Sequence, residues 1–313
     1  MGCSIIEGLD NIPPQLHGCV LTIGNFDGVH RGHQQILSAA VDRARQEGIK
    51  ACVLTFDPPP AVVLSDKSCH ERIIPEHIKH RLIADIGLDA IVVVRTTREF
   101  LSHSPEQFVR DVMVERFHLK YLVEGRNFFF GKDRAGNIQT LQDLACQYSF
   151  DVIIVEPVMI NLPGEGEVRI SSSLIRRLIG RGDFSSAARC LGRDFVLYGE
   201  VIPGHGRGRE LSFPTANVDP NGLVVPPQGV YAAWSEIDGV RYRSAVSVGP
   251  RPTFGIEQDV IEVHLIGAEG VFYGKEIAIT FHERLRDLQK FPDADTLRRQ
   301  IEQDVKRVCE ILQ

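Results

Sequence analysis

Hydrophobic and polar positions follow two different patterns along the chain, one in each half. In the first half, short and continuously apolar runs alternate with stretches whose apolar residues recur every three or four positions. Continuous runs are typical of strands buried on both faces, and the wider spacing is typical of amphipathic helices. We expect strands at 18–23, 49–56, 89–94, 119–123 and 151–155, and helices at about 31–47, 75–87, 104–117 and 138–149. This order predicts an α/β domain with a parallel sheet, in which ligands bind at the carboxyl ends of the strands.

The second half has a different pattern, which starts after a pair of short helices expected at 171–180 and 183–191. Between about 194 and 282, short alternating strands are separated by glycine- and proline-containing turns. Strands of this kind predict an antiparallel sheet, either closed as a small barrel or stacked as a sandwich. An amphipathic helix is expected last, at about 293–311. We therefore predict two domains, 1–182 and 183–313.

Composition narrows the class of protein. With 313 residues, 43% hydrophobic and 24% charged, the chain is long enough for two globular domains. No apolar run approaches the ~20 residues that span a bilayer, and no signal-peptide pattern begins the sequence. The seven cysteines are scattered without a CxxC pair, which argues against disulfides and zinc and indicates a reducing cytoplasm. A net charge of −6 gives no support to a nucleic-acid surface. Oligomeric state is left open.

The stretch "IGNFDGVHRGHQQIL", residues 23–37, joins the first expected strand to the first expected helix. Backbone N–H groups at such a turn and the positive end of the helix dipole favour phosphate. His30 and His33 could donate hydrogen bonds to phosphate oxygens as charge develops on them. The simpler alternative is a helix start that carries surface histidines. Three glycines let the chain approach a ligand closely: Gly24, Gly28 and Gly32.

Two later stretches of this half also have functional and structural interpretations. "EGRNFFFGKDRAGN", residues 124–137, offers the Asn127 amide and aromatic faces, or is a hydrophobic loop beneath the sheet. "RISSSLIRRLIGRG", residues 169–182, places serines at a helix start with arginines one turn later. Such a helix can bind an anion, or can be a capped helix with a solvated basic face.

The most specific stretch of the second half is "GEVIPGHGRGRELSFPTANV", residues 199–218. Its loop around Arg207, between Gly206 and Gly208, could form a basic flap over phosphates. Thr215 and Asn217 would share one face of a strand, where a hydroxyl and an amide oxygen can hold Mg²⁺ that also binds water and substrate phosphates. The alternative is an ordinary turn.

The alternating stretch "DVIEVHLIG", residues 259–267, places Glu262 and His264 on one face of a strand. Glu262 is a candidate general base for a hydroxyl nucleophile. The alternative is a half-exposed strand whose polar face is in water.

The HxGH turn with a serine-rich helix after the last strand resembles nucleotidyltransferases. The longer motifs "GNFDGVHRGH", "NFFFG" and "RISSSLIR" resemble the adenylyltransferase module of the bifunctional prokaryotic riboflavin kinase/FAD synthetase family. The resemblance implies a Rossmann-like nucleotidyltransferase fold in which His30 and His33 contact the ATP phosphates. It also implies ATP-binding roles for Gly24, Phe26, Gly28, Gly32, Asn127, Arg169, Ser172, Ser173 and Arg176.

"PTAN", "DVIEVHLIG", "SVGPRPTFG" and "LRDLQKF" occur in the order and spacing of riboflavin kinase, the usual C-terminal partner of that module. This resemblance implies a six-stranded antiparallel barrel. Thr215 and Asn217 would bind Mg–ATP, and Glu262 would activate the ribityl 5′-hydroxyl. Arg286 would lie near the flavin, and ATP would contact Gly206, Arg207 and Gly208.

Four positions depart from the family pattern, and the mildest is Ser173, where the family usually has a threonine and the hydroxyl is kept. Pro59 replaces a histidine that is thought to help organise ATP and magnesium. Phe129 stands where a basic or small polar residue is common, and Leu288 replaces a glutamate near the flavin.

The resemblances together imply a bifunctional cytoplasmic enzyme of flavin biosynthesis. Riboflavin would be phosphorylated to FMN by the second domain, and FMN adenylylated to FAD with release of pyrophosphate by the first. ATP would be the co-substrate and Mg²⁺ the cofactor. Pro59 leaves one alternative open, a riboflavin kinase whose first domain holds flavin without adenylylating it. The other alternative is a cytidylyl or pantetheine-phosphate transferase of the same fold, and the PTAN-to-Glu262 half counts against it.

Overall fold

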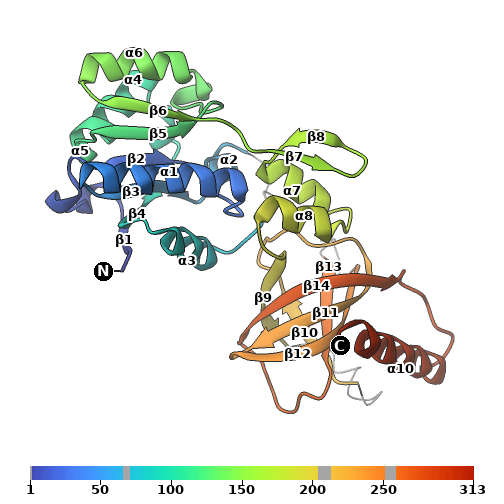
Figure 1. The fold of residues 1–313 in the computed structure, drawn as a ribbon. Coiled ribbons are helices and arrows are strands. Elements are labelled where there is room, and N and C mark those ends of the chain that lie inside the picture. Colours follow the sequence, from blue (N-terminus) through green and yellow to red (C-terminus); the bar gives the residue numbers. More distant parts are fainter. Residues whose placement is uncertain (1, 66–70, 204–212, 251–258) are drawn as a thin grey trace. The chain divides into compact units, whose positions relative to one another are not determined.

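The computed structural model describes residues 2–65, 71–203, 213–250 and 259–313. It divides into two compact units, each described by itself below (Figure 1). Unit 1 comprises residues 1–70 and 76–171, and unit 2 comprises residues 71–75 and 172–313. No helix in the described ranges combines the length and the apolar character that crossing a membrane requires.

Unit 1 is built on a six-stranded parallel sheet with the strand order β1-β4-β3-β2-β5-β6. Its strands are β1 (Ser4–Glu7), β2 (Val20–Ile23), β3 (Ala51–Asp57), β4 (Ala90–Arg95), β5 (Tyr121–Gly125) and β6 (Asp151–Val155). The five strands expected from the sequence are confirmed. The edge strand β1 was not predicted, because its four residues are mostly exposed and have no apolar periodicity.

Helices cover both faces of this sheet. On one face lie α1 (Arg31–Glu47) and α3 (Glu76–Ile86); on the other lie α4 (Pro105–Gln107), the π-helical turn η4 (Phe108–Val114), α5 (Glu115–Phe117) and α6 (Ile138–Tyr148). The single helix expected at 104–117 is therefore three consecutive pieces. Short elements complete the unit: η1 (Leu9–Asn11), η2 (Pro14–Leu16), α2 (Pro60–Leu64), η3 (Phe100–Ser102), η5 (Lys132–Arg134) and the hairpin β7 (Met159–Leu162) with β8 (Gly166–Arg169).

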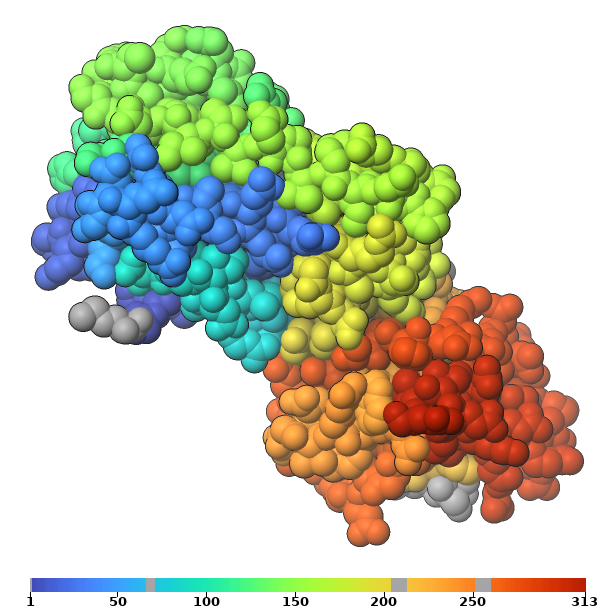
Figure 2. All heavy atoms as spheres, viewed as in Figure 1, coloured from blue at the N-terminus to red at the C-terminus, as the bar shows by residue number. Residues whose placement is uncertain are grey.

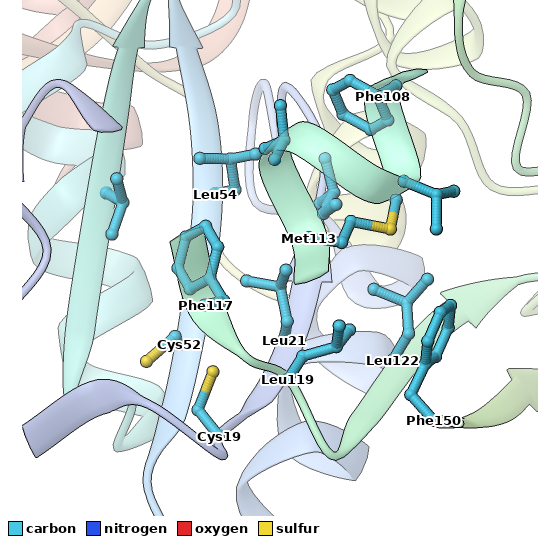
Figure 3. Close-up of a cluster of buried hydrophobic side chains, with 14 of the residues drawn as sticks. Cys19, Leu21, Cys52, Leu54, Phe108, Met113, Phe117, Leu119, Leu122 and Phe150 are labelled. Atoms are coloured by element: carbon cyan, nitrogen blue, oxygen red, sulfur yellow. The ribbon is translucent and has the colours of Figure 1, made fainter. Parts of the chain in front are cut away.

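The main core of unit 1 lies between the sheet and the helices η4, α5 and α6 on its second face (Figure 3). Leu21 of β2 and Leu54 of β3 are fully buried there with Phe117 and Met113. Alternate residues of the parallel strands point to this core and the others point to α1, which explains the continuous apolar runs.

The sheet order places the switch point of the fold beside β2. The chain moves outward from β2 through β3 to β4, and then returns to the other side of β2 to form β5. In open parallel sheets, ligands bind at the carboxyl ends of the strands where the order reverses. The turn that follows Ile23 stands at this place.

Unit 2 contains a closed antiparallel barrel with the strand order β10-β13-β12-β11-β14-β9. Its strands are β9 (Val196–Ile202), β10 (Ala216–Asp219), β11 (Gly229–Ile237), β12 (Val240–Pro250), β13 (Asp259–Leu265) and β14 (Glu276–Arg286). The structure thus decides for the barrel and against the sandwich. Ile261 and Val263 are fully buried and Leu265 is nearly so, as expected for the inward positions of an alternating strand.

In the described part of unit 2, the helices beside the barrel are α7 (Ser172–Ile179), α8 (Phe184–Leu191) and α10 (Ala294–Ile311). Phe184 of α8 stacks on Phe195 and Phe281, so this helix shares an aromatic core with the strands. The C-terminal helix α10 lies against the barrel wall (Figure 2). There Val308 and Leu312 are buried beside Ala232.

Candidate active sites

The glycine-rich turn after β2 has an unusual backbone. Phe26, Gly28 and Val29 have positive φ angles of 49°, 82° and 39°. The Val29 N–H donates to the Phe26 carbonyl at 3.0 Å, which closes the turn before α1 begins. Positive φ is costly for residues with side chains and persists only where the surroundings impose it. The turn is therefore held in one conformation at the carboxyl end of the first central strand.

His30 caps the helix that follows this turn. Its Nδ1 accepts a hydrogen bond from the His33 N–H at 3.2 Å. An imidazole that accepts at Nδ1 carries its proton on Nε2, so His30 is neutral with Nε2–H as a donor. A Cβ atom at Gly32 would lie 3.2 Å from the His30 ring, which explains why glycine stands between the histidines.

The two histidine rings stack on each other, with centroids 3.5 Å apart and planes inclined by 18°. Burial lowers the pKa of His33 well below its ordinary value, and the neighbouring His30 and Lys79 lower it further. Within the described part of the chain, His33 Nδ1 is buried and makes no hydrogen bond. The pair therefore consists of two neutral imidazoles, which can donate to an anion but add no fixed charge.

A buried cation near these histidines was not predicted. Lys79 of α3 is 3% exposed, and its Nζ lies 3.1 Å from Thr55 Oγ1 and 2.7 Å from Glu76 Oε2. Burial of a lysine requires such partners. Periodicity could not reveal its burial, because Lys79 occupies an ordinary polar position in an amphipathic helix.

The loop after β5 has a buried part and an exposed part. Phe130 is buried in the core and stacks with Phe128 at 5.3 Å, so the loop does fold under the sheet. Asn127 and Phe129, in contrast, are exposed, and the Arg134 guanidinium lies 5.0 Å from the centre of the Phe129 ring. Asn127 is thus open to a ligand while its neighbours anchor the loop.

The serine–arginine segment is divided between the two units. Arg169 is exposed at the end of β8 in unit 1, and the Ile170 carbonyl lies 3.9 Å from where a Cβ of Gly32 would be. The chain therefore passes beside the histidine turn just before α7. Ser172, Ser173 and Arg176 belong to unit 2, where Arg176 Nε donates to the Glu71 carbonyl at 2.7 Å. Their role in binding triphosphate stays a prediction.

Strand register brings together two residues of the predicted kinase site. Asn217 of β10 pairs with Glu262 of β13, and Glu262 pairs on its other side with Ser247 of β12. Side chains directly opposite each other in an antiparallel sheet have Cβ atoms about 5 Å apart. Glu262 is exposed, so this row lies on the outer face of the barrel. Ser247 was not predicted, because the sequence alone does not reveal which strands are neighbours.

His264 supports the segment that carries Thr215. Its Nδ1–H donates to the Pro214 carbonyl at 2.9 Å, and its ring meets Phe213 edge to face at 5.3 Å. Thr215 immediately precedes β10, which carries Asn217, and their common face stays a prediction. Gly206, Arg207 and Gly208 lie outside the described residues.

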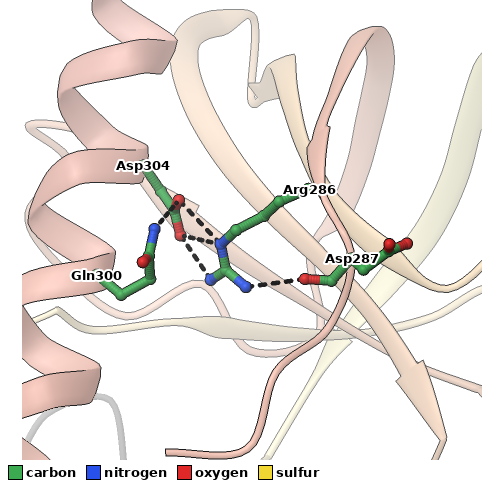
Figure 4. A network of polar contacts seen from close by, with 4 residues as sticks. All are labelled: Arg286, Asp287, Gln300 and Asp304. Atoms are coloured by element: carbon green, nitrogen blue, oxygen red, sulfur yellow. Dashed lines mark hydrogen bonds and ion pairs between the residues drawn. The ribbon is translucent and has the colours of Figure 1, made fainter.

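Arg286 is held by protein groups (Figure 4). Its Nε and Nη2 donate to the Asp304 carboxylate at 3.0 and 2.7 Å, and its Nη1 donates to the Asp287 carbonyl at 3.0 Å. Gln300 also donates to Asp304, at 3.0 Å. The arginine therefore ties the last barrel strand to α10, and its predicted contact with flavin stays a prediction.

The oxygen ligands of the predicted kinase site suit magnesium. Thr215 and Asn217 supply neutral oxygen atoms, and Mg²⁺ commonly combines few protein ligands with water and substrate phosphates. Among the residues described, no three His, Cys, Asp or Glu side chains gather as a metal site. Mg²⁺ would therefore be held in part by ATP itself.

The fold and the two residue clusters define a two-domain transferase, with a nucleotidyltransferase sheet joined to a kinase barrel. A family model described as FAD synthetase matches residues 12–174, and one described as riboflavin kinase matches residues 191–312. The chain belongs to the bifunctional riboflavin kinase/FMN adenylyltransferase family, which confirms the resemblance seen in its motifs.

Relatives match over nearly the whole chain. The bifunctional riboflavin kinase/FMN adenylyltransferase of Escherichia coli K12 is 34% identical over 96% of this chain and 95% of the relative. That of Bacillus subtilis is 36% identical, over 91% and 90%. A solved structure of a Streptococcus pneumoniae protein, named as a macrolide-efflux protein, has 28% identity and a TM-score of 0.82 over 98% of both chains.

Proposed function

We propose that the enzyme performs two consecutive transfers on flavin, each at one of the clusters described above. The barrel phosphorylates riboflavin to FMN, and the domain of the parallel sheet adenylylates FMN to FAD. Riboflavin, FMN and ATP are the small-molecule substrates. The cytoplasmic location indicated by the scattered cysteines belongs to the same proposal.

In the kinase step, Glu262 takes the proton of the ribityl 5′-hydroxyl. The hydroxyl oxygen forms a bond to the γ-phosphorus of ATP, the bond from that phosphorus to the β–γ bridging oxygen breaks, and ADP leaves. Mg²⁺ held at Thr215 and Asn217 would neutralise the phosphate charge. The observation that carries this assignment is the pairing of Asn217 with Glu262, because it sets the base beside the metal ligand.

In the adenylyl step, no strong base is needed, because the FMN phosphate is already ionised. One of its oxygens bonds to the α-phosphorus of ATP, the bond from that phosphorus to the α–β bridging oxygen breaks, and pyrophosphate leaves. His30 and His33 donate to the phosphate oxygens as charge develops there. Their neutral stack supports this role, since a charged pair 3.5 Å apart would repel itself.

The remaining ATP contacts are assigned from the motifs that the chain shares with the family. We propose ATP-binding roles for Gly24, Phe26, Gly28, Gly32, Asn127, Arg169, Ser172, Ser173 and Arg176 in the first site, and for Gly206, Arg207 and Gly208 in the second. Arg286 is proposed to act near the flavin.

Product analysis tests the whole assignment. The purified chain is incubated with riboflavin, ATP and Mg²⁺, and the flavins are separated. We expect FMN that is converted to FAD with time. FMN as the sole product would indicate a riboflavin kinase whose first domain does not adenylylate FMN. This is the alternative that Pro59, in place of the family histidine, leaves open. No flavin product at all would contradict both roles.

A further inference from the structure

The backbone ladder between β2 and β5 is short. It pairs Val20 with Tyr121 and Leu21 with Leu122, and no pair follows toward the carboxyl ends. On its other side β2 stays paired with β3 through Ile23, and the Gly24 N–H donates to the Leu54 carbonyl at 3.0 Å. The central strand is therefore tied by backbone on one side only, at the point where the phosphate-binding turn starts.

A carboxyl group occupies the place of the missing ladder bond. Glu124 of β5 is 3% exposed, and its Oε1 accepts a hydrogen bond of 2.6 Å from the Ile23 N–H. This contact joins residues 101 positions apart and lies one residue before Gly24. It links β5 to the last residue of β2, and it satisfies a backbone donor that burial would otherwise leave without a partner.

The protonation state of Glu124 agrees with a structural hydrogen bond. Burial raises the pKa of this carboxyl well above its ordinary value, although bonds from the Ile23 and Gly125 backbone oppose the shift. A neutral carboxyl still accepts through its carbonyl oxygen. Glutamine can reproduce this contact, whereas leucine fills a similar volume and cannot accept.

We propose that Glu124 is the positioning residue of the phosphate-binding turn: its side chain fixes the end of β2 against β5 and so sets where His30 and His33 meet ATP. The proposal rests on the proposed role of that turn in adenylylation. Glu124 itself does not need to touch the substrate. A misplacement of about 1 Å in a positioning element can cost on the order of 10²-fold in rate.

The test compares Glu124→Leu with Glu124→Gln in the full-length enzyme. We expect Glu124→Leu to lower kcat of FMN adenylylation by on the order of 10-fold to 10²-fold with little change in the KM for FMN. Glu124→Gln should keep adenylylation within about 3-fold of the wild type, since its amide oxygen accepts from Ile23. Riboflavin phosphorylation by the same preparations is the internal control for folding and concentration.

Amide hydrogen exchange gives a readout independent of activity. The Ile23 amide should exchange faster in Glu124→Leu and at the wild-type rate in Glu124→Gln. Wild-type kcat in Glu124→Leu would overturn the proposal, as would an equal loss of adenylylation in both variants. If Glu124→Leu does not fold, Glu124→Gln is compared with Glu124→Asn, which carries a smaller acceptor. Wild-type adenylylation in Glu124→Asn together with fast exchange of the Ile23 amide would then overturn the proposal.

A parallel His33→Ala variant separates this inference from the function on which it rests. Loss of adenylylation in His33→Ala with wild-type rates in Glu124→Leu would overturn the positioning role alone. Unchanged adenylylation in His33→Ala would show that the turn is not the phosphate site, and would overturn both.

Discussion

At the scale of single residues, the chemistry of each site depends on how a few polar side chains are kept in one protonation state. His30 is fixed in one tautomer by its cap bond, and His33 is kept neutral by burial. Glu262, in contrast, is exposed. This contrast fits the proposed roles, in which the histidines donate hydrogen bonds and the glutamate accepts a proton.

The role of His33 can be measured in adenylylation. If it donates to oxygens only as charge develops, His33→Ala should lower kcat by roughly 10²-fold and change the KM for ATP much less. His17→Ala, an exposed histidine of the same unit, is the control and should leave both parameters unchanged. An unchanged kcat would return His33 to the class of structural histidines.

The role of Glu262 can be measured in single-turnover phosphorylation of riboflavin. Glu262→Gln keeps the shape of the side chain and removes its basicity, so FMN formation should fall by on the order of 10²-fold or more. Riboflavin and Mg–ATP affinities, and adenylylation of supplied FMN, should stay near wild-type values. Glu236→Gln changes another exposed strand glutamate and should have no effect. Wild-type turnover in Glu262→Gln would remove Glu262 from the mechanism.

The buried carboxyl of Glu124 should also make the unfolding free energy of the protein depend on pH. Its pKa is raised in the folded protein, so the folded state binds this proton more tightly than the unfolded state. Stability is therefore lost as pH rises above the unfolded pKa, by up to about 1.4 kcal/mol per pH unit until the folded pKa is reached. Glu124→Gln lacks this loss. Denaturant unfolding of the wild type and of Glu124→Gln from pH 4 to 9 measures their unfolding free energies. The difference between these free energies should shift in favour of Glu124→Gln as pH rises, and a difference that does not change with pH would contradict a neutral Glu124 carboxyl.

At the scale of elements, the sequence predicted what periodicity and local signals encode. The strands β2 to β6 were predicted because their apolar runs are continuous, and α1 because its apolar residues recur every three or four positions. The strand β1 and the β7–β8 hairpin were missed, since four-residue strands with exposed side chains have no such pattern. The π-helical turn inside the expected helix 104–117 was also missed, because hydrogen-bond register leaves no mark in an apolar pattern.

The dependence on local patterns also explains which residues of the candidate sites could be predicted from the sequence. His30, Asn217 and Glu262 were found because motifs of neighbouring residues reveal them. Ser247 and Glu124 act through partners on other strands, 15 positions from Glu262 in the first case and 101 from Ile23 in the second. Lys79 is similar, since its partner Thr55 belongs to a distant strand. Pairing across a sheet supplies that information, and one sequence does not.

The Arg286–Asp304 link predicts how α10 is held. Asp304 is 6% exposed, so Asp304→Ala leaves the arginine without its partner and should cost about 3 kcal/mol of unfolding free energy in the barrel. Glu302→Ala breaks the exposed pair with Arg298 on the same helix and should cost about 0.5 kcal/mol or less. Chemical denaturation followed by the fluorescence of Trp234 measures both. Equal costs would contradict a buried tether.

At the scale of the whole molecule, two transfers are divided between two separately packed units. Each unit has its own core, and the histidine turn lies in unit 1 whereas Asn217 and Glu262 lie in unit 2. Damage to one cluster should therefore leave the chemistry of the other intact.

Asn217→Ala tests this independence. The variant should lose riboflavin phosphorylation, because the proposed metal ligand beside Glu262 is gone, and should still convert supplied FMN to FAD at a rate within about 2-fold of the wild type. Both reactions are followed on one preparation by separation of the flavins. Loss of both activities in a folded protein would contradict the division into two sites.

The buried thiols of the two units have a practical consequence. Cys19 and Cys52 lie in the core of the parallel sheet with no exposed surface (Figure 3). Cys190 is equally buried in α8. A hydrogen bond with Cys19, together with burial, raises the pKa of the Cys52 thiol, so it is inert toward alkylating reagents while the sheet is closed. The opening of each unit can therefore be measured separately. The rates at which Cys52 and Cys190 are alkylated in native buffer report how often unit 1 and unit 2, respectively, expose their interiors.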